Sequence, residues 1–110
     1  MQPGIYVDIE KLSAVDRDLV VEFTNYMRDL HVIRLIGKQT SWLSRSAKRK
    51  LWKRAKAQSE PLVAGIVGVI KELTGSTNIE LQWLANQCMS NNTNAMEDLR
   101  RLGRKLKQDL

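Results

Sequence analysis

Residues 44–58, with the sequence SRSAKRKLWKRAKAQ, are the stretch around which the rest of the chain is organised. Apart from serine, most of these residues are good helix formers. Ala47, Leu51 and Ala55 recur at intervals of four, so they fall on one side of a helix. The stretch therefore predicts a helix that docks through a narrow apolar stripe and presents a wide basic face.

The positive charge of this predicted helix is not balanced by acids. Seven of its fifteen residues are Arg or Lys, and none is Asp or Glu. Solvated helix surfaces usually mix both signs, whereas a polyanionic partner would compensate a face of one sign. Trp52 borders the cations, where its indole could pack in the core or stack on an unpaired base. The predicted nucleic-acid-binding residues of this helix are Arg45, Lys48, Arg49, Lys50, Trp52, Lys53, Arg54 and Lys56.

Charge alternates along the 110 residues in four blocks. Residues 1–36 carry a net charge of −2, residues 37–58 of +8, residues 59–98 of −4 and residues 99–110 of +4. Such alternation is typical of a folded protein with a polarised surface rather than of a basic tail. The second basic block adds Arg100, Arg101, Arg104 and Lys105 to the predicted interface.

The longest predicted helix precedes the basic one and covers residues 13–37. Ser13 with Asp16 is typical of a helix start, and Gly37 of a helix end. Its apolar residues recur at spacings of three and four, and they form a face wider than one neighbouring helix would cover. This face predicts either the core helix of a bundle or, in part, the interface of a homodimer. Its main positions are Leu19, Phe23, Tyr26, Leu30 and Ile33. The Trp42 side chain, just before the basic helix, is expected to close the core, with stacking on an unpaired base as the alternative.

Three further start signals follow the basic helix. Residues 59–61 (SEP) predict the start of a new helix, which ends at Gly75 and is apolar on every side over residues 62–70, as in a buried helix. Thr77 with Glu80, and Asn94 with Glu97, are capping pairs for two last helices. Before all of these, residues 1–12 predict an extended arm with Ile5, Val7 and Ile9 on its buried side. The predicted fold is all-α: one domain, a compact bundle of about five helices over residues 13–110 with this arm.

The last two predicted helices, on either side of residues 90–93 (SNNT), resemble a helix-turn-helix. In this resemblance Leu84 and Ala85 belong to the supporting helix, and Ala95 and Leu99 face inward from the recognition helix. It implies that the start of the last helix reads DNA bases. The chain departs from the motif at Met89, where the family usually has Gly, at Ser90, where it usually has an apolar residue, and at Glu97 and Asp98, which place negative charge on the recognition helix.

Catalytic chemistry has little support in the sequence. The chain has one His and one Cys, no Gly-rich phosphate loop and no cluster at metal-ligand spacing. Its longest apolar run is too short to span a bilayer, and the single Cys favours a reducing, cytoplasmic setting. The predicted function is non-enzymatic nucleic-acid binding without metal, cofactor or membrane, alone, as a homodimer or in a nucleoprotein complex. Two alternatives stay open: a small helix-turn-helix regulator, and an adaptor or inhibitor that docks on an acidic protein. The choice between DNA and RNA also stays open.

Overall fold

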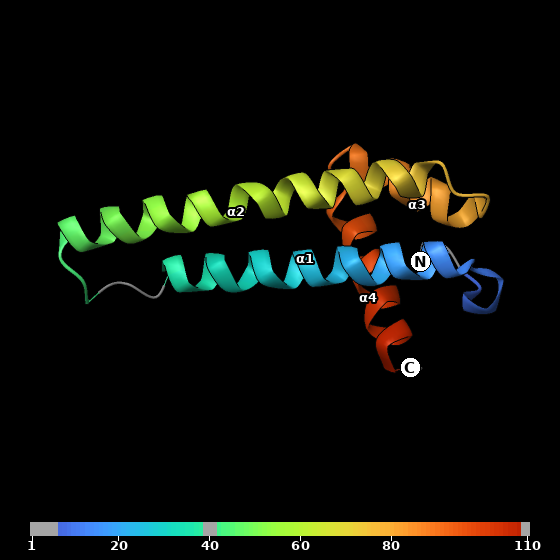
Figure 1. Ribbon diagram of the computed structural model, residues 1–110, viewed down its shortest axis with the longest axis horizontal. Helices are drawn as coiled ribbons and strands as arrows, with labels where there is room; N and C mark the ends of the chain where they lie inside the picture. Colours follow the sequence, from blue (N-terminus) through green and yellow to red (C-terminus); the bar gives the residue numbers. More distant parts are fainter. Residues whose placement is uncertain (1–6, 39–41, 109–110) are drawn as a thin grey trace.

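The chain folds into helices, as the computed structural model shows for residues 7–38 and 42–108 (Figure 1). A short 3-10 helix, η1 (Ile9–Lys11), precedes four α-helices: α1 (Ala14–Lys38), α2 (Arg45–Thr74), α3 (Ile79–Met89) and α4 (Thr93–Gln108). The all-α prediction is therefore confirmed. The prediction of a compact bundle of about five helices is wrong, because the described residues hold four α-helices in an elongated molecule of 52 × 30 × 29 Å.

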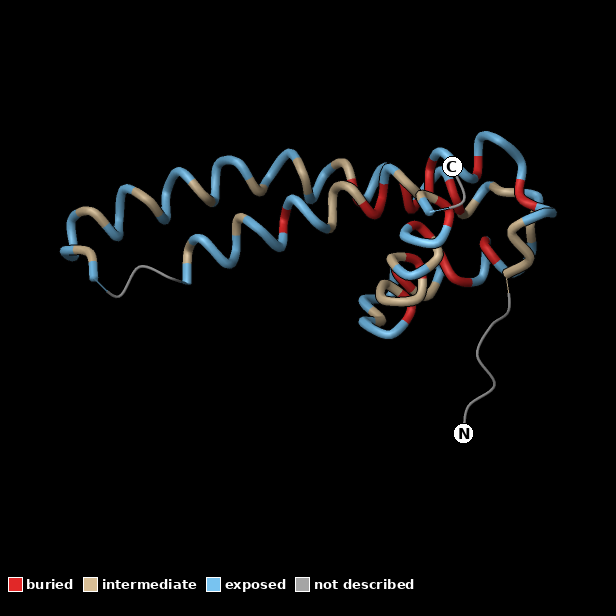
Figure 2. The backbone as a smooth tube through the Cα atoms, turned by 90° about the horizontal axis from the view of Figure 1, so that it is seen from below, coloured by how far each residue is buried: buried red, intermediate tan, exposed pale blue. Residues whose placement is uncertain are grey.

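Two long helices give the molecule its elongated shape. α1 and α2 lie side by side and antiparallel, and α3 and α4 pack at one end of this pair (Figure 1). Buried residues gather at that end (Figure 2). Between Leu30 on α1 and Ile66 on α2, no residue of the described stretches is buried. We call residues 31–38 and 42–65 the projecting hairpin, and the remainder the body.

The body holds the hydrophobic core. Side chains from all four α-helices meet there, and the largest fully buried ones include Phe23, Leu73, Leu81 and Leu99. The inward face predicted for α1 is confirmed over about the first two thirds of the helix, where Leu19, Phe23 and Leu30 are buried. Burial of this apolar surface is the main stabilising contribution to the fold.

α2 is one continuous helix, although residues 59–61 predicted a break. The Ser59 hydroxyl donates a hydrogen bond of 2.9 Å to the Lys56 carbonyl and does not cap a new helix. Pro61 removes only one N–H donor, and the carbonyl of Ala57 that loses its partner belongs to an exposed residue that water can reach. Pro61 is therefore tolerated inside the helix, and α2 keeps packing along α1.

The apolar segment of α2 is buried on one side only, which corrects the expectation of a helix buried all round. Ile66, Val69 and Ile70 are buried, whereas Val63 and Val67 are exposed. The reason is that α1 and α3 cover one face of this helix, and the opposite face has no neighbouring helix in the described part of the chain.

Three caps fix the helix starts in the body. The Ser13 hydroxyl accepts a hydrogen bond from the Asp16 amide at 3.1 Å, as predicted. α3 is capped by Asn78 rather than Thr77, since the Asn78 side chain accepts from the Leu81 amide at 3.0 Å. α4 is capped by Asn92 rather than Asn94, since the Asn92 side chain accepts from the Asn94 and Ala95 amides. Asn is at least as good an N-cap as Thr, which explains why Asn78 rather than Thr77 caps α3.

The N-terminal arm packs on the body over the residues that are described. Val7 and Ile9 are half-buried against the core, in agreement with the predicted buried side, while Ile5 lies outside the described residues. Residues 9–11 form the 3-10 helix instead of extended chain, and the Asp8 side chain accepts from the Glu10 amide. Arg17 holds this turn on α1 by donating to the Ile9 carbonyl at 3.0 Å.

Two glycines allow α1 to approach its neighbours closely. A Cβ added at Gly103 of α4 would lie 1.7 Å from the Thr24 hydroxyl, and one added at Gly65 of α2 would lie 2.7 Å from the Tyr26 ring. A Cβ at Gly68 of α2 would have no neighbour within 4 Å, so no other element approaches the helix closely at this glycine. Gly103 and Gly65 therefore determine how closely α4 and α2 lie against α1.

We expect Gly103→Ala and Gly68→Ala to have opposite effects on stability. The first forces a methyl group into Thr24 and should lower the free energy of unfolding by about 1–3 kcal/mol, as overpacking usually does. The second adds a better helix former in open space and should raise it by up to about 1 kcal/mol. Urea denaturation of both variants measures the difference, and a shift of the same sign in both would contradict the crossing geometry.

We also expect the projecting hairpin to open more readily than the body. Amides of residues 45–65 should exchange with solvent faster than those of residues 66–73, although both stretches belong to α2, because buried side chains begin at Ile66. Hydrogen exchange resolved along α2 tests this. Uniform protection from one end of the helix to the other would show that the hairpin is as stable as the body.

Candidate nucleic-acid interface

The basic residues of α2 lie on the projecting hairpin and point into solvent. All seven cations between Arg45 and Lys56 are exposed, and none forms an ion pair or side-chain hydrogen bond within the described part of the chain. Arg45, Arg49 and Lys53 form one row at intervals of four residues. With Ser46 and Lys50 this row lines a shallow hollow of about 390 Å³. The predicted cations of α2 are therefore all exposed, and four of them line one hollow.

The docking stripe explains why the cations face outward. Ala47, Leu51 and Ala55 are half-buried, as predicted, on the side of α2 that packs along α1. At about 100° per residue, the row of Arg45, Arg49 and Lys53 lies on the opposite side of the helix. Docking of the stripe on α1 thus presents the basic face to solvent.

α1 adds cations that the sequence analysis did not assign to the interface. Arg34 and Lys38 are exposed on the end of α1 that runs alongside the basic half of α2, whereas Arg28 is exposed on the body and pairs with Asp29 at 3.7 Å. Residues 28–58 together contain ten basic residues and one acidic residue, Asp29, whereas the remainder of the chain has a net charge of −3. The antiparallel pairing of α1 and α2 brings these charges together in space, although they fall in separate charge blocks along the sequence.

The basic residues of α4 lie elsewhere and are partly neutralised. Glu97 pairs with Arg100 at 3.1 Å and with Arg104 at 3.3 Å, and Asp98 pairs with Arg101 at 3.7 Å. α4 belongs to the body, whereas the basic half of α2 lies at the far end of the hairpin (Figure 1). The structure therefore does not join the two predicted basic segments into one surface.

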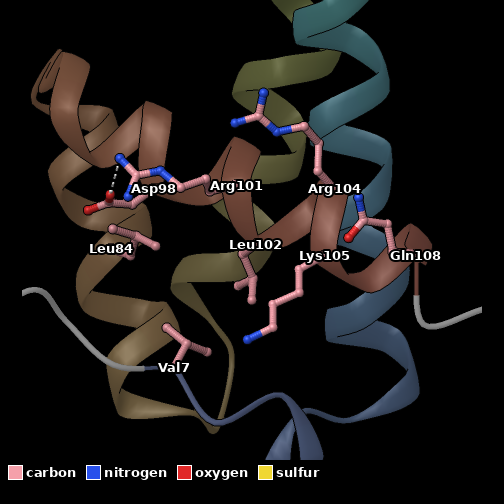
Figure 3. A pocket seen from close by; sticks show the side chains of 8 residues that line it. All are labelled: Val7, Leu84, Asp98, Arg101, Leu102, Arg104, Lys105 and Gln108. Carbon is pink, nitrogen blue, oxygen red and sulfur yellow. Dashed lines mark ion pairs between the residues drawn. The ribbon is translucent and has the colours of Figure 1, made fainter.

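The cations of α4 border a hollow that differs in character from the basic face. Figure 3 shows this hollow of about 530 Å³, in which Arg101 and Lys105 stand beside the apolar side chains of Val7 and Leu102. The Asp98 carboxylate also lines it and is directed at Arg101. Because its lining mixes both signs of charge with apolar groups, this hollow is a weaker match for a polyanion than the face on α2.

Two tryptophans lie on the projecting hairpin. Trp42 precedes α2 and is 80% exposed, so the expectation that it closes the core is wrong: the core lies in the body, beyond its reach. Trp52 is 65% exposed, and part of its ring lies over Gly37 of α1, where an added Cβ would be 3.9 Å from indole carbons. Trp52 therefore makes a limited packing contact and keeps most of its surface accessible.

The positions that carry the helix-turn-helix resemblance are buried as expected. Leu84, Ala85, Ala95 and Leu99 all face the core. The turn itself differs, because Met89 is still helical and Asn91 is the residue with a left-handed backbone, at φ 61°. Whether α4 reads DNA stays a prediction.

The described residues hold a buried cysteine and no group of side chains able to hold a metal ion. Cys88 is buried, and burial together with the charge of Asp98 raises the pKa of its thiol to about 12, so the thiol is protonated at neutral pH. Across residues 7–38 and 42–108, His, Cys, Asp and Glu form no group able to hold a metal ion. None of the helices described is long and apolar enough to cross a membrane.

Comparisons of the chain with protein-family models, with curated proteins and with solved structures find no match.

Proposed function

We propose that the protein binds nucleic acid, without catalysing a reaction, through the basic face of its projecting hairpin. One observation supports this most strongly: the seven exposed cations from Arg45 to Lys56, over about three turns of α2, have no anionic partner among the described residues. Phosphates along a nucleic-acid strand supply closely spaced negative charges that complement such a face. Lys and Arg contacts of this kind position a protein on the backbone without reading sequence.

The distribution of charge over the whole molecule favours one orientation in the complex. Residues 28–58, which hold most of the hairpin and the adjoining turn of α1, carry a net charge of +9, and the rest of the chain carries −3. A polyanion attracts residues 28–58 and repels the rest of the chain, so the hairpin is the part that contacts the polyanion. The body then stays on the far side, where it is free to contact a second copy or another subunit of a nucleoprotein complex.

The cations of α4 have a secondary role in this proposal. Arg100, Arg101 and Arg104 already have carboxylate partners at 3.1–3.7 Å. A phosphate would have to displace those carboxylates or bind beside them, which reduces the gain from each contact. We therefore place the main contacts on α2 and on Arg34 and Lys38 of α1.

Binding should depend strongly on salt and on the cations of α2. If about four cations meet phosphates, the logarithm of the affinity for duplex DNA should fall against the logarithm of the salt concentration with a slope of roughly −3.6. Changing Lys48, Arg49, Lys53 and Arg54 to Gln should abolish binding and leave helical content intact, because these positions avoid the docking stripe. Titration by fluorescence anisotropy at several salt concentrations measures both effects.

A matched control removes the same charge elsewhere. Changing Arg100, Arg101, Arg104 and Lys105 to Gln also lowers the net charge by four, but on the body, and should weaken binding much less. Equal losses in the two variants would show that only net charge matters. An affinity independent of salt would reject the proposal and favour the alternative of an acidic protein partner.

The helix-turn-helix alternative makes a different prediction about Asn92. In the structure its side chain caps α4 by accepting from two amides at 3.0 and 3.2 Å, so we expect Asn92→Ala to cost about 1 kcal/mol of stability and to leave base discrimination unchanged. We also expect no duplex to be preferred more than about tenfold over random DNA. A selection from random duplexes that converges on one motif, with the motif lost in Asn92→Ala, would instead identify a sequence-reading regulator.

A further inference from the structure

A groove runs between α1 and α2 on one side of the projecting hairpin. It encloses about 280 Å³, and its floor consists of the apolar side chains of Leu30, Ile33 and Ala55. Arg34 lies on the α1 side of the groove and Lys56 on the α2 side, and the indole of Trp52 forms part of the lining. The groove therefore combines an apolar floor, an aromatic surface and cations from both helices.

Trp52 is placed for stacking rather than for core packing. The indole is 65% exposed, and its contact over Gly37 orients the ring at the edge of the groove. Lys48 and Lys56 lie one helical turn before and after it on the same side of α2, and both are exposed. Each flank of the exposed indole thus carries a positive charge.

We infer that this groove holds an unpaired base of a single-stranded segment, stacked on Trp52, with the adjoining phosphates on Lys48, Lys56 and Arg34. The inference rests on the proposed function and specifies its ligand. Bases of a single strand have free faces for an aromatic side chain, whereas bases in a duplex are already stacked. DNA and RNA strands share this chemistry.

The charges of the groove select this occupant over an apolar peptide or a duplex. A nucleotide has a flat ring with apolar faces and an anionic link on either side, which matches an apolar floor between cations. A hydrophobic helix has no anionic groups to meet the exposed Arg34 and Lys56, whereas the phosphates of a nucleotide complement both. A duplex would contact the cations of α2 but would leave Trp52 and the groove floor unused.

The test compares three tryptophan variants on three ligands. Trp52→Ala is matched by Trp42→Ala, whose residue is 80% exposed on the same hairpin, and by Trp83→Ala, whose residue is 47% exposed on the body. Each variant is titrated at one salt concentration against a single-stranded DNA, a single-stranded RNA and a DNA duplex of equal length. Circular dichroism checks that all three remain folded.

We expect Trp52→Ala to weaken single-strand binding by about 5- to 150-fold, the range for loss of one base–aromatic stack. The two control variants should change it less than about threefold, duplex binding should hardly change, and Trp52→Phe should restore most of the affinity because it keeps a stacking ring. A larger effect on RNA than on DNA would still support the inference and would identify RNA as the source of the base.

Two other outcomes would overturn the inference in distinguishable ways. If Trp52→Ala behaves like Trp42→Ala while the fourfold Gln variant of α2 still abolishes binding, the proposed function stands and the groove is not a base site. If the unmodified protein binds none of the three ligands, both proposals fail together.

Discussion

The packing of α1 against both α2 and α4 is the contact on which the rest of the structure depends. Two points of close approach define it: the Tyr26 ring over Gly65 of α2, and the Thr24 side chain over Gly103 of α4. The hydroxyl of Thr24 is satisfied within α1 by the Val20 carbonyl at 3.0 Å, so the crossing buries no unpaired donor. With α4 held across α1 and α3 held on the end of α2, one core forms at one end of the long pair.

The projecting hairpin forms because α1 and α2 extend beyond the end of the molecule where α3 and α4 pack. α2 has 30 residues, and its buried residues start only at Ile66. The first half of α2 is thus held away from the core by its stripe on α1. Cations in this position stay hydrated, and they cost little free energy even without partners.

This arrangement places the proposed binding surface in the part of the molecule with the fewest buried side chains. The distal helices contact each other through half-buried positions such as Ile33, Leu51 and Ala55. Segments of this kind tend to open with low free energy, and a ligand that bridges both helices stabilises the closed form by mass action. A strand seated between Arg34 and Lys56 would bridge them in this way.

Local signals in the sequence determined the helical nature of the chain, the docking stripe and the unbalanced charge of residues 44–58, because helix propensity and periodicity act between near neighbours. The tertiary structure decided the rest. Pro61 does not end α2, since packing along α1 outweighs one lost hydrogen bond. Trp42 is exposed because the core forms at the other end of the molecule, and Arg34 joins the cations of α2 because the two long helices lie side by side. Each of these outcomes depends on contacts between residues far apart in the chain, which no local pattern encodes.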